Sequence, residues 1–253
     1  MLNPTQIAFF REHGYLVLPG LADQAYCQQI VADAQAALAS HCGEIEYEAD
    51  TRYPGAPASR DAEGGMTARR LLQAYARSPQ LAQWATGAQL AAPLISLLGE
   101  GAALSQAHHN CIMTKQPRYS TATGWHRDSR YWQFVRADLV SAWLALGNET
   151  VENGCLWVIP GTHKLTLHEG QLDDLQFLIK DHPDNQDLLK QAVAVPLQQG
   201  DVLLFHSQLF HAAGNNQTQQ TKFSLVFTYH AADNPPLPGS RSARLPDIPL
   251  NLN

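Results

Sequence analysis

Residues 200–230, GDVLLFHSQLFHAAGNNQTQQTKFSLVFTYH, contain two strand-like runs that are separated by turn residues. Gly200-Asp201 marks a turn before the first run, and Gly214 to Asn216 mark another before the second. Short, mostly apolar runs with such boundaries are typical of the strands of a β-sandwich or β-barrel. We therefore expect a mainly β fold in this part of the chain.

Runs of the same kind continue upstream from this stretch to about residue 103 and include DLVSAWLALGN, GCLWVIPG and AVAVPL. Residues 164–191 interrupt them with the helix-like sequences LDDLQFLIK and NQDLLKQ, which we interpret as an insertion at one end of the β core. The tail, 233–253, contains five prolines and is expected to be extended and packed on the outside.

The first hundred residues are expected to be mostly helical. Asn3-Pro4 predicts the start of a helix and Gly14 its end, followed by a short strand at 15–18. Helical sequence then covers 22–39 and roughly 67–99. Between them, the residues 51–66 are rich in Gly and Pro and predict a long loop, either a lid over a site or a surface excursion.

A single domain is expected to span the whole chain. Its parts are a mostly helical flank at 1–100, a jelly-roll core at 101–232 with the insertion 164–191, and the extended tail 233–253.

Composition excludes several classes of protein. The 253 residues are 45% hydrophobic and 16% charged, which is an ordinary globular mixture. The net charge is −6 without a basic block, so nucleic acid is not an expected partner. No long apolar run or signal-peptide pattern is present, so we expect no membrane span. The four cysteines are widely spaced without a C-x-x-C pair, which indicates a reducing compartment and thus the cytoplasm.

A possible metal site begins in the sequence GWHRD, residues 124–128. His126 and Asp128 are two positions apart and face the same side if the backbone is extended. Together they supply two of the three ligands of the facial triad found in iron(II) oxygenases. His211 lies far downstream on a different strand and can supply the third ligand, while Lys222, 11 residues later, places a cation in the same pocket. Each feature alone is weak, but their combination predicts an iron(II) site.

These motifs resemble those of the phytanoyl-CoA dioxygenase family, within the Fe(II)/2-oxoglutarate-dependent oxygenases. The similar segments are TQIAFFREHGYLVLPGL, GWHRD, AWLALGNETVENGCLWVIPGTH and GDVLLFHSQLFHAAGNN, in the family's order and at its spacing. The resemblance covers most of the chain and implies a double-stranded β-helix, a cupin-like jelly roll. It also implies Fe(II), 2-oxoglutarate and dioxygen, with hydroxylation of an unactivated C–H bond of a small molecule and release of succinate and CO2.

The resemblance assigns His126, Asp128 and His211 to the metal. Where the family usually has an arginine for the far carboxylate of 2-oxoglutarate, this chain has Lys222, which keeps the charge but lacks the bidentate fork. Expected neighbours of the co-substrate are Ser224, on the same face as Lys222, together with Trp143, Asn110 and Lys115. The residues expected to border the substrate cavity are Arg127, Tyr131 and Trp132, and Arg127 and Arg130 are further candidates for pairing with an anionic substrate.

The remaining histidines are expected to be structural. His206 should face away from His211, His163 lies in a family turn, and one of His108 and His109 must point inward as a core residue.

Three alternative functions stay open at this stage. A halogenase or desaturase-like relative is possible, although Asp128 fills the coordination position that a halide would need. A metal-binding cupin without oxygenase activity and, more remotely, a zinc hydrolase are the others. The substrate and the oligomeric state are not determined by these motifs.

Overall fold

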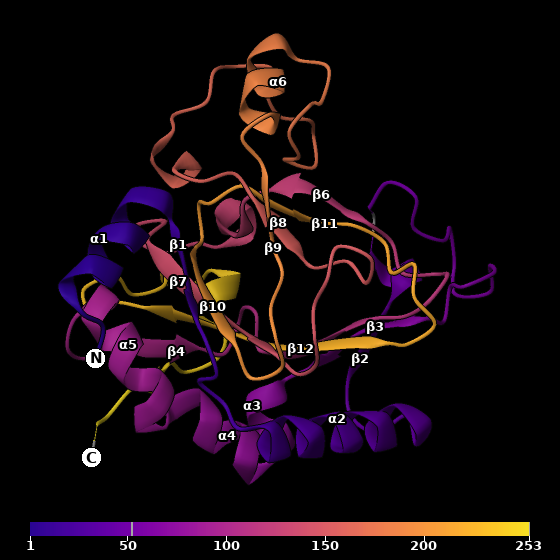
Figure 1. Cartoon of the computed structure of the whole chain (residues 1–253), viewed down its shortest axis with the longest axis horizontal. Coiled ribbons are helices and arrows are strands. Elements are labelled where there is room, and N and C mark those ends of the chain that lie inside the picture. The colour runs from indigo at the N-terminus through magenta and orange to yellow at the C-terminus, as the bar shows by residue number, and fades with distance from the viewer. Residues whose placement is uncertain (52, 253) are drawn as a thin grey trace.

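Two antiparallel sheets form the centre of the protein in the computed structural model, which describes residues 1–51 and 53–252 (Figure 1). The larger sheet consists of β1 (Tyr15–Leu18), β2 (Ile45–Tyr47), β3 (Ala68–Leu72), β4 (Ala103–Ser105), β5 (Cys111–Lys115), β7 (Leu139–Ala145), β10 (Val202–His206), β12 (Lys222–His230) and β13 (Ile248–Pro249). The smaller sheet consists of β6 (Thr123–His126), β8 (Leu156–Val158), β9 (Val193–Val195) and β11 (His211–Ala213). The mainly β core predicted from the sequence is confirmed.

The strand orders are those of two facing sheets rather than a simple meander. The larger sheet runs β1-β10-β7-β12-β5-β3-β2, with β4 beside β12 and β13 beside β4. The smaller sheet runs β6-β11-β8-β9. Strands far apart in sequence, such as β6 and β11, are therefore neighbours in space.

Helices cover the face of the larger sheet that lies away from the smaller one (Figure 1). They are α2 (Gln24–Ala39), α3 (Ala74–Arg77), α4 (Pro79–Thr86) and α5 (Ala88–Leu98), while α1 (Pro4–His13) lies beside the edge strand β1. As predicted, α1 begins at Asn3, whose side chain accepts a hydrogen bond from the Gln6 amide, and ends at Gly14 with φ of 79°. Within the described ranges, no helix is both long and apolar enough to cross a membrane.

The central strand β12 is buried along its whole length, and its alternate side chains point to opposite faces of the sheet. Phe223, Leu225 and Phe227 pack into the hydrophobic cluster beneath the helices. The alternate residues, beginning with Lys222 and Ser224, consequently point into the space between the two sheets. Strand periodicity thus places polar side chains inside the jelly roll, where burial requires that they find partners.

The same division applies to the neighbouring strands β5 and β7. Cys111 of β5 and Trp143 of β7 pack in the cluster between the sheets, whereas Ile112 packs beneath the helices. Lys115 shares its face of β5 with Cys111 and therefore also points between the sheets. It lies directly opposite Lys222 in the register of β5 and β12.

The prediction of helix throughout 67–99 is wrong at its start. Residues 68–72 form β3, because Arg70 to Leu72 pair with Met113 to Cys111 of β5. Sheet pairing here outweighs the local helical pattern, as is common for short segments. The β strands of the sheet therefore extend into the part of the chain expected to be mostly helical.

Much of the helical prediction for 164–191 is also wrong. The α-helix of this segment is α6 (Pro183–Leu189), whereas the LDDLQFLIK sequence folds back on itself through a tight turn, with Leu172 bridging Leu178 and Phe177 bridging His126. Figure 1 shows this insertion beyond β6 and β8, on the opposite side of the molecule from α2. The predicted loop at 51–66 includes residue 52, which lies outside the described residues; the rest of it consists of turns and bends.

Candidate metal centre

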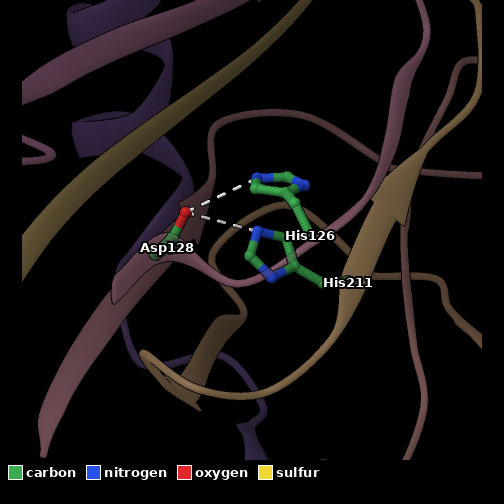
Figure 2. Close-up of side chains that lie close together, drawn as sticks. All are labelled: His126, Asp128 and His211. Atoms are coloured by element: carbon green, nitrogen blue, oxygen red, sulfur yellow. Dashed lines mark ion pairs between the residues drawn. The ribbon is translucent and has the colours of Figure 1, made fainter. Parts of the chain in front are cut away.

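Three potential metal ligands meet between the sheets (Figure 2). His126, at the end of β6, is the register partner of His211, at the start of β11, and Asp128 begins the short 3-10 helix Asp128–Tyr131. The Nε2 atoms of His126 and His211 lie 3.6 and 3.5 Å from Oδ1 of Asp128. Among residues 1–51 and 53–252, this is the one group of three or more potential ligands close enough to hold an ion.

The hydrogen bonds of the two imidazoles use Nδ1 and leave Nε2 as the nitrogen that can bind a metal. Nδ1 of His126 lies 2.8 Å from the Gly124 carbonyl, and Nδ1 of His211 lies 3.0 Å from the Leu209 carbonyl. A carbonyl can only accept, so each Nδ1 carries a proton, and each Nε2 faces Asp128 and can bind a cation when it is unprotonated. Figure 2 shows both rings turned toward this carboxylate.

The donor set fits iron(II). Oδ2 of Asp128 is buried and has no hydrogen-bond partner among the described residues, as expected of an oxygen that is intended for a metal. Two imidazole nitrogens and one carboxylate oxygen on the same side of an ion leave other positions open, as in non-haem iron(II) sites. Asp128 is not part of the strand, as the sequence suggested, but the extended backbone of Arg127 preserves the two-residue alternation.

Electrostatics at the site favour metal binding at neutral pH. Burial and the neighbouring His211 lower the pKa of His126 to about 3, so its imidazole is neutral. Burial alone would raise the pKa of Asp128, but His109 and His211 outweigh it and hold this pKa well below its usual range. The carboxyl is therefore ionised. Burial opposes protonation of His211, yet Asp128 raises its pKa, and a bound cation would take the place of that proton.

A third histidine supports the carboxylate. Nε2 of His109 lies 3.0 Å from Oδ1 of Asp128, and the His109 backbone has a φ of 30°, a region that non-glycine residues rarely occupy. Such strain persists where surrounding structure enforces it, often at functional sites. His108, by contrast, is a core residue with its Nε2 2.6 Å from Oγ of Ser242. The sequence predicted that one of the two is an inward-pointing core residue, which is His108. It did not predict that the other, His109, contacts Asp128.

We expect His109→Ala to weaken iron binding about 10- to 100-fold, because groups that orient metal ligands contribute on this scale. The measurement is anaerobic titration of the apoprotein with Fe(II) against a chelator. His109→Gln retains an N–H donor and should recover much of the loss. Equal iron affinity in the wild-type protein and in His109→Ala would show that Asp128 is held without His109.

A cavity of about 430 Å³ adjoins the three ligands. Its lining includes four cations from three strands, namely Arg69 and Arg70 of β3, Lys115 of β5 and Lys222 of β12. Arg69 Nη1 lies 2.8 Å from Glu48 and Arg70 Nη1 lies 2.9 Å from Glu46, so each arginine has its own carboxylate. The cavity thus combines a metal site with a wall of cations and of the glutamates that pair with the two arginines.

Three residues assigned to the co-substrate converge instead on Glu149, a fully buried carboxylate. Lys222 Nζ donates to Oε2 at 2.9 Å, while the Ser224 hydroxyl and the Trp143 indole N–H donate to Oε1 at 2.6 and 2.9 Å. The cavity lining includes Lys222 and Trp143, with the ammonium 5.1 Å from the indole centroid. Glu149 was not recognised in the sequence because an acidic residue in the turn-like GNETVENG is ordinarily solvent-exposed.

The side chains of two other predicted site residues form hydrogen bonds with neighbouring segments of the protein. Asn110 lines the cavity, but its side chain holds the preceding turns: Oδ1 accepts from the Tyr75 amide, and Nδ2 donates to Gln73 and Gln106. Arg127 is not among the residues that line the cavity, and its guanidinium donates to the carbonyls of Thr162 and Leu165.

The two aromatic residues that follow the metal motif lie at the cavity. Tyr131 and Trp132 both line the cavity, as does Arg130, and the Tyr131 side chain is half exposed. His206 is not part of the ligand group and has its Nε2 3.1 Å from Asp138, as expected from its position in the strand.

A jelly roll that gathers two histidines and an aspartate beside such a cavity defines a non-haem iron oxygenase. The family model for phytanoyl-CoA dioxygenase (PhyH) matches residues 10–224. The chain belongs to the phytanoyl-CoA dioxygenase family of iron- and 2-oxoglutarate-dependent oxygenases.

Relatives of known activity agree with this assignment. Human peroxisomal phytanoyl-CoA dioxygenase is 33% identical over 138 residues, which cover 50% of this chain and 40% of that protein. Ectoine dioxygenase of Sphingopyxis alaskensis is 28% identical over 255 residues, covering 92% and 77%. The epimerase SnoN, solved with Fe3+, alpha ketoglutarate and nogalamycin RO, has a TM-score of 0.74 at 24% identity and covers 98% of this chain and 94% of its own, which confirms the predicted jelly-roll fold.

Proposed function

We propose that this protein hydroxylates an unactivated C–H bond of a small molecule, using Fe(II), 2-oxoglutarate and dioxygen and releasing succinate and CO2. The observation that carries this proposal is the convergence of His126, Asp128 and His211, with both Nε2 atoms facing the carboxylate, beside a cavity that is lined by cations of β3, β5 and β12. The ferrous ion and its co-substrate would supply the oxidising chemistry, and the protein would bind, orient and shield the reactants.

The insertion supports the shielding role. The Phe177 ring lies edge-on to His126 with the ring centroids 5.7 Å apart, and the Arg130 guanidinium lies 4.2 Å from the Phe177 centroid. Gly124 permits this contact, since a Cβ there would be 3.1 Å from the Phe177 ring. An aromatic ring against the metal ligand excludes water from this side of the site, as oxidative chemistry requires.

The substrate would enter beside Tyr131 and Trp132, which line the cavity directly after the metal ligand Asp128. An aromatic, half-exposed border with Arg130 nearby suits an organic substrate that carries an anionic or polar group. Asp128 would supply a carboxylate ligand where a halogenase would need room for a halide, which favours hydroxylation over halogenation. The epimerase activity named for SnoN makes epimerisation at a C–H centre the second candidate reaction. All four cysteines are free, which supports the cytoplasm as the site of action.

We expect the anaerobically iron-loaded protein to consume dioxygen when 2-oxoglutarate is added, with slow formation of succinate even without the substrate. The measurement combines an oxygen electrode with quantification of succinate, and boiled protein and Zn(II)-loaded protein serve as controls. Absence of turnover with every 2-oxo acid would favour a cupin without oxygenase activity. Turnover of a substrate in the absence of oxygen would instead favour a hydrolase.

A further inference from the structure

The binding place expected for the far carboxylate of 2-oxoglutarate already contains a carboxylate of the protein. An indole and a serine hydroxyl each have a single polar hydrogen, and Trp143 and Ser224 both give theirs to Glu149. Lys222 donates to Glu149 as well, and the two side chains are 4% and 0% exposed. The charge of Lys222 is thus neutralised inside the protein, so Lys222 offers little attraction to an incoming anion.

Lys115 presents the opposite situation across the same pair of strands. Lys115 lines the cavity, and its ammonium donates to the Thr121 carbonyl at 3.3 Å. Among the residues that the structure describes, none supplies a carboxylate within ion-pair distance of this ammonium, whereas Arg69, Arg70 and Lys222 each have one. Its stem is held against Gly154, where a Cβ would lie 2.6 Å from Lys115 Cδ.

We propose that Lys115, rather than Lys222, binds the far carboxylate of the co-substrate, and that Glu149 is the permanent counter-ion of Lys222. This inference rests on the proposed function. The metal would bind the near carboxylate and the keto oxygen of a 2-oxo acid. The far carboxylate needs a cation of its own, since an uncompensated buried anion is strongly disfavoured. Of the two lysines that line the cavity, Lys222 is paired with Glu149, whereas Lys115 has no carboxylate partner among the described residues.

The titration of Lys115 agrees with this role. Burial, together with Arg69 and Lys222, lowers its pKa to about 7, although Glu48 and Glu149 act in the opposite direction. A bound carboxylate would favour the charged form. Above pH 7 the free protein must therefore take up a proton when 2-oxoglutarate binds, and its affinity should fall by up to about tenfold per pH unit.

The test is calorimetric titration of anaerobic, Fe(II)-loaded protein with 2-oxoglutarate and with 2-oxobutyrate, which lacks the far carboxylate. We expect Lys115→Met to weaken 2-oxoglutarate about 10- to 100-fold, the range for a hydrogen bond between charged groups, and to leave 2-oxobutyrate nearly unchanged. The fall in affinity between pH 7 and 9 should disappear in this variant.

The control is the double variant Glu149→Gln/Lys222→Met, which removes both charges but keeps an acceptor for Trp143 and Ser224. We expect it to lose less than about threefold in 2-oxoglutarate affinity, because a neutralised pair contributes little attraction. Loss of 2-oxoglutarate selectivity in the double variant but not in Lys115→Met would overturn the inference and return the role to Lys222. Equal binding of both acids by the wild-type protein would also overturn it. Failure of the wild-type protein to bind any 2-oxo acid would instead refute the proposed function.

Discussion

His126→Ala and His211→Ala are each expected to reduce bound iron from about one ion per chain to background. Each substitution removes one of three protein ligands, and the remaining histidine and Asp128 cannot enclose the ion. Anaerobic loading with Fe(II), desalting and elemental analysis measure the effect. In the wild-type protein, iron should also raise the unfolding temperature by mass action, and this rise should be absent in both variants.

The matched control is His206→Gln, a histidine five residues before His211 in the same motif. Its imidazole contacts Asp138 rather than the metal ligands, so the variant should bind iron as the wild-type protein does. Stoichiometric iron in His211→Ala would contradict the site, and with it the assignment of the chain's chemistry. Loss of iron in His206→Gln would indicate that iron retention reports general stability rather than ligation.

Glu149→Leu is expected to destabilise the fold by about 3–5 kcal/mol, because it leaves the Lys222 ammonium buried without its anion. Trp143 and Ser224 would lose their acceptor at the same time. The measurement is the free energy of unfolding from urea denaturation of the metal-free protein, where iron linkage does not contribute. Lys222→Met should have a similar effect for the converse reason, since Glu149 would remain as an unpaired buried anion.

The double variant Glu149→Gln/Lys222→Met should recover most of that loss, since replacing a whole buried pair by neutral groups is often close to neutral. The surface pair Lys190–Asp187 provides the contrast, because both side chains are about three-quarters exposed. Lys190→Met should leave the urea midpoint unchanged. If Glu149→Leu were as stable as the double variant, the buried ion pair would have no structural role.

Local sequence was sufficient for the features that depend on spacing. The alternation of His126 and Asp128 survives although Asp128 lies outside the strand, because the intervening backbone is still extended. The Asn3 and Gly14 boundaries of α1 follow from hydrogen bonds within a few residues. In contrast, helix was wrongly predicted at β3 and before α6, where partners from elsewhere in the chain determine the conformation.

The sequence by itself determined the candidate ligand set, the strand-rich core and the family, because these depend on residue identity and short-range order. Only the tertiary structure decided how the buried charges are paired. Glu149 reaches Lys222 across 73 residues, and His109 reaches Asp128 from a strained turn. Lys115 and Lys222 face each other only because β5 and β12 are neighbours. Ion pairing depends on distance in space and on burial, and neither quantity is encoded by the position of a residue along the chain.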